Sequence, residues 1–144
     1  MTESTERILL DTNILVYAYD SREPAKHQKA KSILRQSWLK KAHYAISTQS
    51  LSEFFVVITK KIGMPVEEAQ QIVQDLVAFQ NFTILNFNFT TVLQAISFHK
   101  KTRVHYYDSL LATTMIQHGV SHIYTENIKD FKAVPGIEAT NPLA

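Results

Sequence analysis

The pattern of a strand that turns directly into a helix is clearest in one segment: Arg7-Ile8-Leu9-Leu10-Asp11-Thr12-Asn13-Ile14-Leu15-Val16-Tyr17. Its first half predicts a short apolar strand over Ile8–Asp11, and its second half predicts a short helix over Asn13–Tyr19. Ligands of open α/β sheets bind at the carboxyl ends of the strands, which is where Asp11 stands. The same residue could instead cap the helix, because an Asp there accepts a backbone N–H and contributes ~1 kcal/mol.

Strand-like and helix-like segments alternate along the rest of the chain. Further strands are predicted over Tyr44–Ser47, Phe82–Leu85 and His122–Thr125, with an edge strand over Ile137–Thr140. Further helices are predicted over Ala25–Lys41, Thr48–Ile62, Pro65–Phe79, Phe89–Lys101 and Asp108–His118. This alternation is typical of an α/β fold with a parallel sheet. We therefore expect one α/β domain over residues 1–144, with a central parallel sheet of four to five strands.

The composition excludes several classes of protein. The 144 residues include no cysteine, so neither disulfides nor a thiolate zinc site can form. Only three glycines are present, and no glycine-rich phosphate loop or Gly-x-Ser-x-Gly motif occurs. No apolar run approaches the ~20 residues of a membrane span, and the polar segment Met1–Glu6 is unlike a signal peptide. We expect a soluble, cytoplasmic protein that does not act on a membrane.

Charge and histidine content give weaker indications. The net charge is only +2, but basic residues gather in clusters such as Lys60-Lys61 and Lys100–Arg103. Each cluster closes a predicted helix, where cations complement the helix dipole. Around an acidic pocket, however, basic residues are expected of an enzyme that acts on a polyanion. The six histidines show no spacing typical of metal ligands, so we interpret them as surface or structural residues.

Acidic residues recur at the predicted ends and faces of later elements. Glu53 lies opposite the apolar stripe of its predicted helix, so periodicity alone indicates an exposed residue. Asp108 shares a helical face with apolar residues, so it must be paired, capping the helix or metal-bound, because an isolated buried carboxylate is costly. The segment Thr125–Phe131 follows a strand and is predicted to be a loop, in which Asx residues usually form turns.

Each of these acids alone can be explained as a helix cap, a surface residue or a turn former. Taken together, the four acids are better explained as a binding site. Asp11, Glu53, Asp108 and an acid of the Glu126–Asp130 group are distributed over one predicted edge of the sheet. Carboxylates brought together repel one another unless a cation holds them, and Mg²⁺ and Mn²⁺ suit oxygen ligands. The set therefore indicates a divalent metal site and phosphoryl chemistry.

Four segments, in order and spacing, resemble the PIN-domain family, and within it the small ribonucleases of the VapC toxin type. Asp11–Leu15 resembles the opening Asp-x-Asn motif, and Ser50–Phe54 resembles the region of the helix glutamate. Tyr107–Ala112 resembles the third motif, and Thr125–Phe131 resembles the fourth. One departure lies in the last motif, because Asn127 stands where many relatives carry an Asp.

This resemblance implies a three-layer α/β/α PIN-like domain that acts as a metal-dependent endoribonuclease. It makes Asp11, Glu53, Asp108 and Asp130 the catalytic acids, and it moves Glu53 from the exposed face into the pocket. Asp11 and Asp108 would bind Mg²⁺ or Mn²⁺ directly. Glu53 would bind through water or at a second metal position. The fourth ligand would be Asp130, Glu126 or Asn127. The side chains that would orient these ligands are those of Thr12, Asn13 and Thr125. A metal-activated water would attack the RNA phosphodiester and leave a 5′-phosphate and a 3′-hydroxyl.

The resemblance also implies partners, and alternatives remain beside it. We expect RNA as substrate, a homodimer, and a small antitoxin protein that inhibits the chain as the toxin of a type II toxin–antitoxin pair. The alternative is a PIN-fold module that binds nucleic acid or protein and has weak catalysis, which the Asn127 departure favours. A haloacid-dehalogenase-like phosphatase would need an Asp where Asn13 stands, and a receiver domain would need an acidic pair near the first strand.

Overall fold

The computed structural model describes residues 6–144, so most of the polar segment Met1–Glu6 lies outside the described residues. The strands are β1 (Arg7–Leu10), β2 (His43–Ser47), β3 (Phe82–Leu85), β4 (His122–Tyr124) and β5 (Glu138–Thr140). The helices are α1 (Thr12–Tyr19), α2 (Pro24–Trp38), α3 (Thr48–Lys60), α4 (Val66–Ala78), α5 (Phe89–Thr102), α6 (Tyr106–Gln117) and α7 (Ile128–Phe131). In this part of the chain, no helix combines the length and the apolar character that crossing a bilayer requires.

All five strands run parallel in one sheet, in the order β3-β2-β1-β4-β5. The chain adds β2 and β3 on one side of β1, and β4 and β5 on the other. The direction of winding therefore reverses between β1 and β4, where parallel sheets leave a crevice at the carboxyl ends of their strands. Asp11 follows β1 and Thr125 follows β4, so both residues border this crevice.

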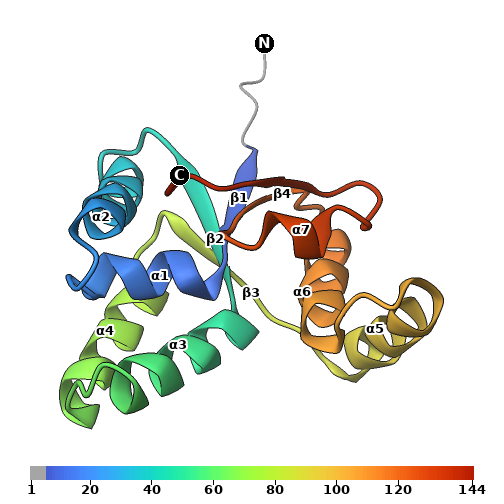
Figure 1. Ribbon diagram of the computed structural model, residues 1–144, viewed down its shortest axis with the longest axis horizontal. Coiled ribbons are helices and arrows are strands. Elements are labelled where there is room, and N and C mark those ends of the chain that lie inside the picture. The colour runs from blue at the N-terminus through green and yellow to red at the C-terminus, as the bar shows by residue number, and fades with distance from the viewer. Residues whose placement is uncertain (1–5) are drawn as a thin grey trace.

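Helices cover both faces of the sheet. Helices α1 to α4 lie on one side of the sheet, and α5 to α7 lie on the other (Figure 1). Parallel strands buried on both faces carry apolar residues in succession rather than in alternation with polar ones. Leu9 and Leu10 illustrate this, since both are fully buried but belong to different core clusters. The prediction of a three-layer α/β/α fold with a parallel sheet is confirmed.

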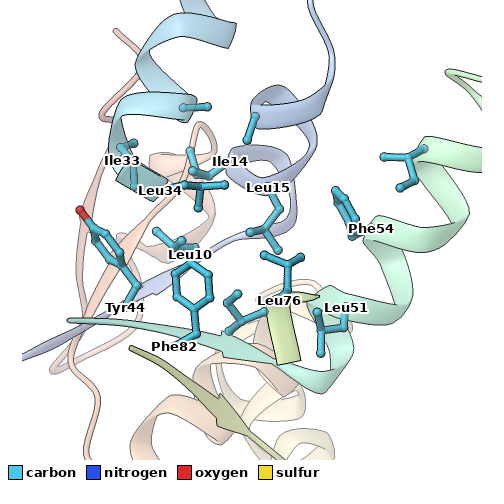
Figure 2. Packing of buried hydrophobic residues seen from close by; sticks show 14 of the residues in the cluster. Leu10, Ile14, Leu15, Ile33, Leu34, Tyr44, Leu51, Phe54, Leu76 and Phe82 are labelled. Carbon is cyan, nitrogen blue, oxygen red and sulfur yellow. The ribbon is translucent and has the colours of Figure 1, made fainter. Parts of the chain in front are cut away.

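Two apolar cores fix the sheet between its helix layers. On the α1–α4 side, Leu10 and Ile14 pack with Phe54 of α3 and Phe82 of β3 (Figure 2). On the other side, Leu9 packs in a cluster with residues of α6, β4 and α7, which include Leu111, Met115, Ile123 and Phe131. Because the turn from β1 into α1 lies between these cores, its backbone has little freedom to move.

Two predicted boundaries at the carboxyl edge are wrong. Helix α6 begins at Tyr106, so Asp108 is its third residue and does not open it. The segment Thr125–Phe131, predicted to be a loop, contains the short helix α7. A helix of four residues is too short to show an apolar period, and α7 forms because Phe131 is buried and Asp130 N–H donates to Asn127 O at 3.0 Å.

The first core predicts a large stability loss for a single truncation. Phe54 is 0% exposed, so Phe54→Ala should lower the free energy of unfolding by about 3–5 kcal/mol through lost burial and a residual cavity. Phe89, which is 74% exposed on α5, is the matched control, and Phe89→Ala should change stability by less than about 0.5 kcal/mol. Urea denaturation measures both values, and equal losses would contradict this description of the core.

Candidate metal and catalytic site

The carboxylate of Asp11 is held at the point where the sheet reverses its winding. Its backbone N–H donates to Tyr124 O at 3.0 Å and so extends the pairing of β1 with β4 by one residue. One carboxylate oxygen accepts from the N–H of Thr12 at 2.8 Å, and the other accepts from Thr125 Oγ1 at 2.8 Å. Asp11 is thus the N-cap of α1 as well as a residue of the crevice, and the two interpretations are not exclusive.

Glu53 is exposed on α3, yet its carboxylate is fixed beside Asp11. Thr12 Oγ1 donates to Glu53 Oε2 at 2.8 Å, and Gln49 Nε2 donates to Glu53 Oε1 at 3.2 Å. The same Gln49 amide nitrogen donates to Tyr107 O at 3.0 Å, which links α3 to the start of α6. Periodicity indicated that Glu53 is exposed, and the resemblance implied that it lies in the pocket. Both hold, because the exposed face of α3 borders the pocket.

Asp108 is a half-buried carboxylate without a hydrogen-bond partner among residues 6–144. It does not cap α6, since the helix begins two residues earlier. The buried residues Leu111 and Met115 of the same face anchor the helix and hold Asp108 against the crevice. Burial, followed by the nearby carboxylates of Asp130 and Asp11, raises its pKa from 3.8 to about 6.

The pKa of Asp11 is raised as well, and burial is again the main cause. The hydrogen bonds from Thr125 and Thr12 lower it, whereas the charges of Glu53 and Asp130 raise it. At both Asp11 and Asp108 the surroundings therefore disfavour the charged carboxylate more than water does. A charge that burial and neighbours disfavour in this way is typical of functional sites.

The three candidates for the fourth metal ligand, Glu126, Asn127 and Asp130, differ in what they contact. The carboxylate of Glu126 pairs with the Lys26 ammonium of α2 at 2.7 Å, and Asn127 N–H donates to Thr125 Oγ1 at 3.0 Å. Asp130 is exposed on α7 and, within residues 6–144, its carboxylate has no ion pair and no hydrogen bond. Asn13 supports the same loop, because its Oδ1 accepts from the N–H of Glu126 at 3.4 Å.

One cavity of about 720 Å³ gathers nearly all of the residues predicted for the site. The predicted residues that line it are Asp11, Thr12, Asn13, Glu53, Asp108, Glu126, Asn127 and Asp130. Thr125 lies behind them, fully buried, and is joined to the site by its hydrogen bonds with Asp11 and Asn127. The cavity is also lined by Lys61 of the basic Lys60-Lys61 cluster, and by residues that were not predicted for the site, among them Asp20, Arg22, Gln49, His105 and Tyr107.

Some of these additional residues could have been found from the sequence. Gln49 precedes Glu53 by four residues, which places both on one face of α3. Tyr107 and His105 stand next to Asp108 at the start of its helix, so the interpretation of His105 as merely structural or surface is incomplete. Arg22 carried no such signal, because it lies in the loop between α1 and α2, where spacing predicts no orientation.

The chemical types of these residues suit a hard divalent cation. Carboxylate oxygens are what Mg²⁺ and Mn²⁺ prefer, and within residues 6–144 the carboxylate of Asp108 forms no ion pair and no hydrogen bond. As the side chains stand, however, no three or more His, Asp or Glu groups of residues 6–144 are arranged to hold one ion. Binding would therefore require the exposed carboxylates of Glu53 and Asp130 to rotate inward or to act through water.

Comparisons with known proteins identify the family and the fold. The family model of the PIN domain matches residues 8–137. No curated protein gives a significant match. Among solved structures, a toxin–antitoxin complex from Klebsiella pneumoniae contains a similar chain, with 24% identity, a TM-score of 0.64 and coverage of 94% of this chain and 97% of that chain.

Two further solved structures are similar at lower identity. VapC20 of Mycobacterium tuberculosis, a toxin that cleaves the sarcin-ricin loop, is 18% identical with a TM-score of 0.70, over 93% of this chain and 99% of that chain. VapBC2 from Rickettsia felis, bound to a DNA fragment from its promoter, is 22% identical with a TM-score of 0.66, over 93% of this chain and 97% of that chain. At these identities the likeness concerns the fold.

The raised pKa of Asp108 predicts that its charge destabilises the metal-free protein. The folded state favours the protonated carboxyl, so this contribution to stability is complete below pH 3.8 and is lost as the pH rises through about 6. In EDTA at pH 7.5, Asp108→Asn should therefore raise the free energy of unfolding by about 1 kcal/mol, since water screens a half-exposed group and reduces the full effect. At pH 5 the gain should shrink.

Denaturation by urea at the two pH values measures this gain. Glu68 is the matched control because it is also the third residue of its helix, α4, but is exposed away from the cavity. Glu68→Gln should give no pH-dependent gain. A loss of stability in Asp108→Asn at pH 7.5 would show that the Asp108 charge is not a cost to the metal-free fold.

Proposed function

Since the chain belongs to the PIN-domain family, we propose that it is a metal-dependent endoribonuclease that hydrolyses RNA phosphodiester bonds. The observation that carries the proposal is the gathering of Asp11, Glu53, Asp108 and Asp130 on one cavity at the switch point of the sheet. These acids come from separate elements, so the fold and not the local sequence brings them together. Their mutual repulsion is what a bound divalent cation would remove.

We assign the direct contacts to a cation to Asp11 and Asp108, and the supporting contacts to Glu53 and Asp130. Asp130 is a better fourth acid than Glu126, because Lys26 already neutralises the Glu126 carboxylate. The ion pair between Lys26 and Glu126 instead ties α2 to the loop before α7. When bound, Mg²⁺ or Mn²⁺ would supply an activated water and would neutralise charge on the phosphate.

The other residues of the chain position the site. Thr125 and Thr12 hold the two oxygens of Asp11, and Thr12 together with Gln49 holds those of Glu53. Such bonds orient the carboxylates before the substrate arrives. Lys61 lines the cavity and forms no ion pair within residues 6–144, so its ammonium is available to a substrate phosphate.

We further propose that the chain is the toxin of a type II toxin–antitoxin pair in the cytoplasm. The support is its likeness to chains from a toxin–antitoxin complex and from VapBC complexes. On this proposal a small antitoxin protein inhibits the chain, and the active form is a homodimer.

A second candidate function is a binding module with a PIN fold and weak catalysis. It is favoured by Asn127 in place of an acid, and by the absence, within residues 6–144, of a group arranged to hold an ion as it stands. The two candidates differ in whether RNA is cut.

Purified protein incubated with total cellular RNA should produce discrete fragments in Mg²⁺ or Mn²⁺ and none in EDTA. Asp11→Asn should reduce this cleavage by about 100-fold or more, because stabilisation of charge by a bound cation contributes several kcal/mol. Asp75 is an exposed acid on α4 outside the cavity, and Asp75→Asn should retain full activity. Circular dichroism should show that Asp11→Asn stays folded, since the amide is nearly isosteric with the carboxylate.

Cleavage that Asp11→Asn retains would refute the assignment of the site. RNA binding without cleavage by the wild type would favour the second candidate. Growth arrest on expression of the wild type, relieved by Asp11→Asn, would support the toxin role.

A further inference from the structure

Aromatic rings gather at the start of α6, beside the carboxylates. Tyr107 lies 5.4 Å from Tyr106 and 6.0 Å from His105 between ring centroids. Tyr106 in turn meets His99 of α5 edge to face at 6.4 Å. Tyr107 is nevertheless 58% exposed, so its neighbours orient the ring without covering it. An aromatic ring held in this way presents a large apolar surface at a small cost in conformational entropy.

Hydrogen bonds from α3 and from α6 itself fix the backbone under these rings. The Gln49 amide of α3 donates to Tyr107 O at 3.0 Å. Ser109 N–H donates to His105 O at 2.9 Å, and Ser109 Oγ donates to Val104 O at 3.1 Å. The first turn of α6 is thus tied to α3 and to the segment before it, so the backbone that presents its aromatic residues is preorganised.

The rings share a cavity with the acids. His105 and Tyr107 line the same hollow as Asp11 and Glu53, and Tyr107 directly precedes Asp108 in the chain. A nucleic-acid strand whose phosphate lies at these carboxylates would therefore carry a flanking base past Tyr107. Lys61, which lines the same cavity, offers a cation to the strand's backbone.

We propose that Tyr107, supported by His105, is a stacking surface for an unpaired RNA base next to the phosphodiester that is cut. Tyrosine rings take up unstacked bases of single-stranded or looped RNA, whereas the bases of a duplex are already stacked and paired. Every base has a π-face, so such a subsite selects unpaired structure more than sequence. The proposal rests on the proposed function and adds to it the residue that contacts the base beside the cleaved bond.

Binding and cleavage are measured separately to test it. The probe for binding is a fluorescein-labelled 12-nucleotide single-stranded RNA of mixed sequence, titrated with Asp11→Asn protein in Mg²⁺ and followed by anisotropy. In that background, Tyr107→Ala should weaken binding about tenfold, while Tyr107→Phe should bind nearly as tightly, because stacking needs the ring and not the hydroxyl. Trp38, 57% exposed on α2 and outside the cavity, is the matched control, and Trp38→Ala should not change the affinity.

Two further readouts separate stacking from a merely structural role. The bases of the probe are replaced one at a time by abasic sites. At one position this replacement should weaken binding to the protein with Tyr107 but leave binding to Tyr107→Ala unchanged. With the active protein, Tyr107→Ala should raise KM for an unpaired substrate more than it lowers kcat. A hairpin stem of paired RNA should bind weakly to both proteins.

The proposal is overturned if Tyr107→Ala binds the RNA as tightly as its parent, or if Trp38→Ala loses as much affinity as Tyr107→Ala. It is also overturned if no abasic position has an effect on binding that depends on Tyr107. Failure of the proposed function looks different. In that case the wild type would not cut RNA, while the ring-dependent binding would still be observed. Absence of any RNA binding would refute both.

Discussion

The carboxylate of Asp11 is held between the ends of β1 and β4 by hydrogen bonds from Thr12 and Thr125, and the other acids of the site are placed around it. This arrangement puts a negative charge where burial and neighbouring carboxylates disfavour it, as the raised pKa values of Asp11 and Asp108 indicate. A disfavoured carboxylate of this kind is retained only if other interactions hold the backbone that carries it. Here, two apolar cores on opposite faces of the sheet hold the turn from β1 into α1.

The same constraint connects stability to function. Carboxylates that repel one another lower the stability of the metal-free protein, and a bound cation would remove this repulsion. The same repulsion therefore lowers the free energy of unfolding and favours the binding of an ion. The hydrogen bonds of Thr12, Gln49 and Thr125 keep the carboxylates from relieving the repulsion by turning away. Asp130 lies on exposed surface, and within residues 6–144 its carboxylate forms no hydrogen bond and no ion pair, so we expect it to move most when the site is filled.

Much of the fold could be predicted from the sequence, because periodic apolar segments and their alternation depend on local spacing. All five strands were predicted from their apolar runs, within about one residue at each end. Helix α7 and the start of α6 were missed, since a single turn has no period and the start of α6 depends on contacts with α3 and α5. The sequence could not show that Thr125 reaches back to Asp11 or that Lys26 pairs with Glu126. These contacts join residues far apart in the chain, and only the strand order brings them together.

The site could be predicted as a set of residue types but not as a geometry. Periodicity placed Glu53 outward, and it is exposed, but only the crossing of α1 and α3 turns that exposed face toward Asp11. The choice among Glu126, Asn127 and Asp130 likewise needed the ion pair with Lys26, which no spacing rule indicates.

A crystal of the protein soaked in Mn²⁺, with the ion located by its anomalous scattering, would show whether these acids bind a metal. We expect a peak bound directly by carboxylate oxygens of Asp11 and Asp108, at about 2.0–2.4 Å, with Glu53 or Asp130 drawn toward it. A peak elsewhere, or none at millimolar Mn²⁺ with both carboxylates in their metal-free positions, would contradict the claim that these acids form a metal centre.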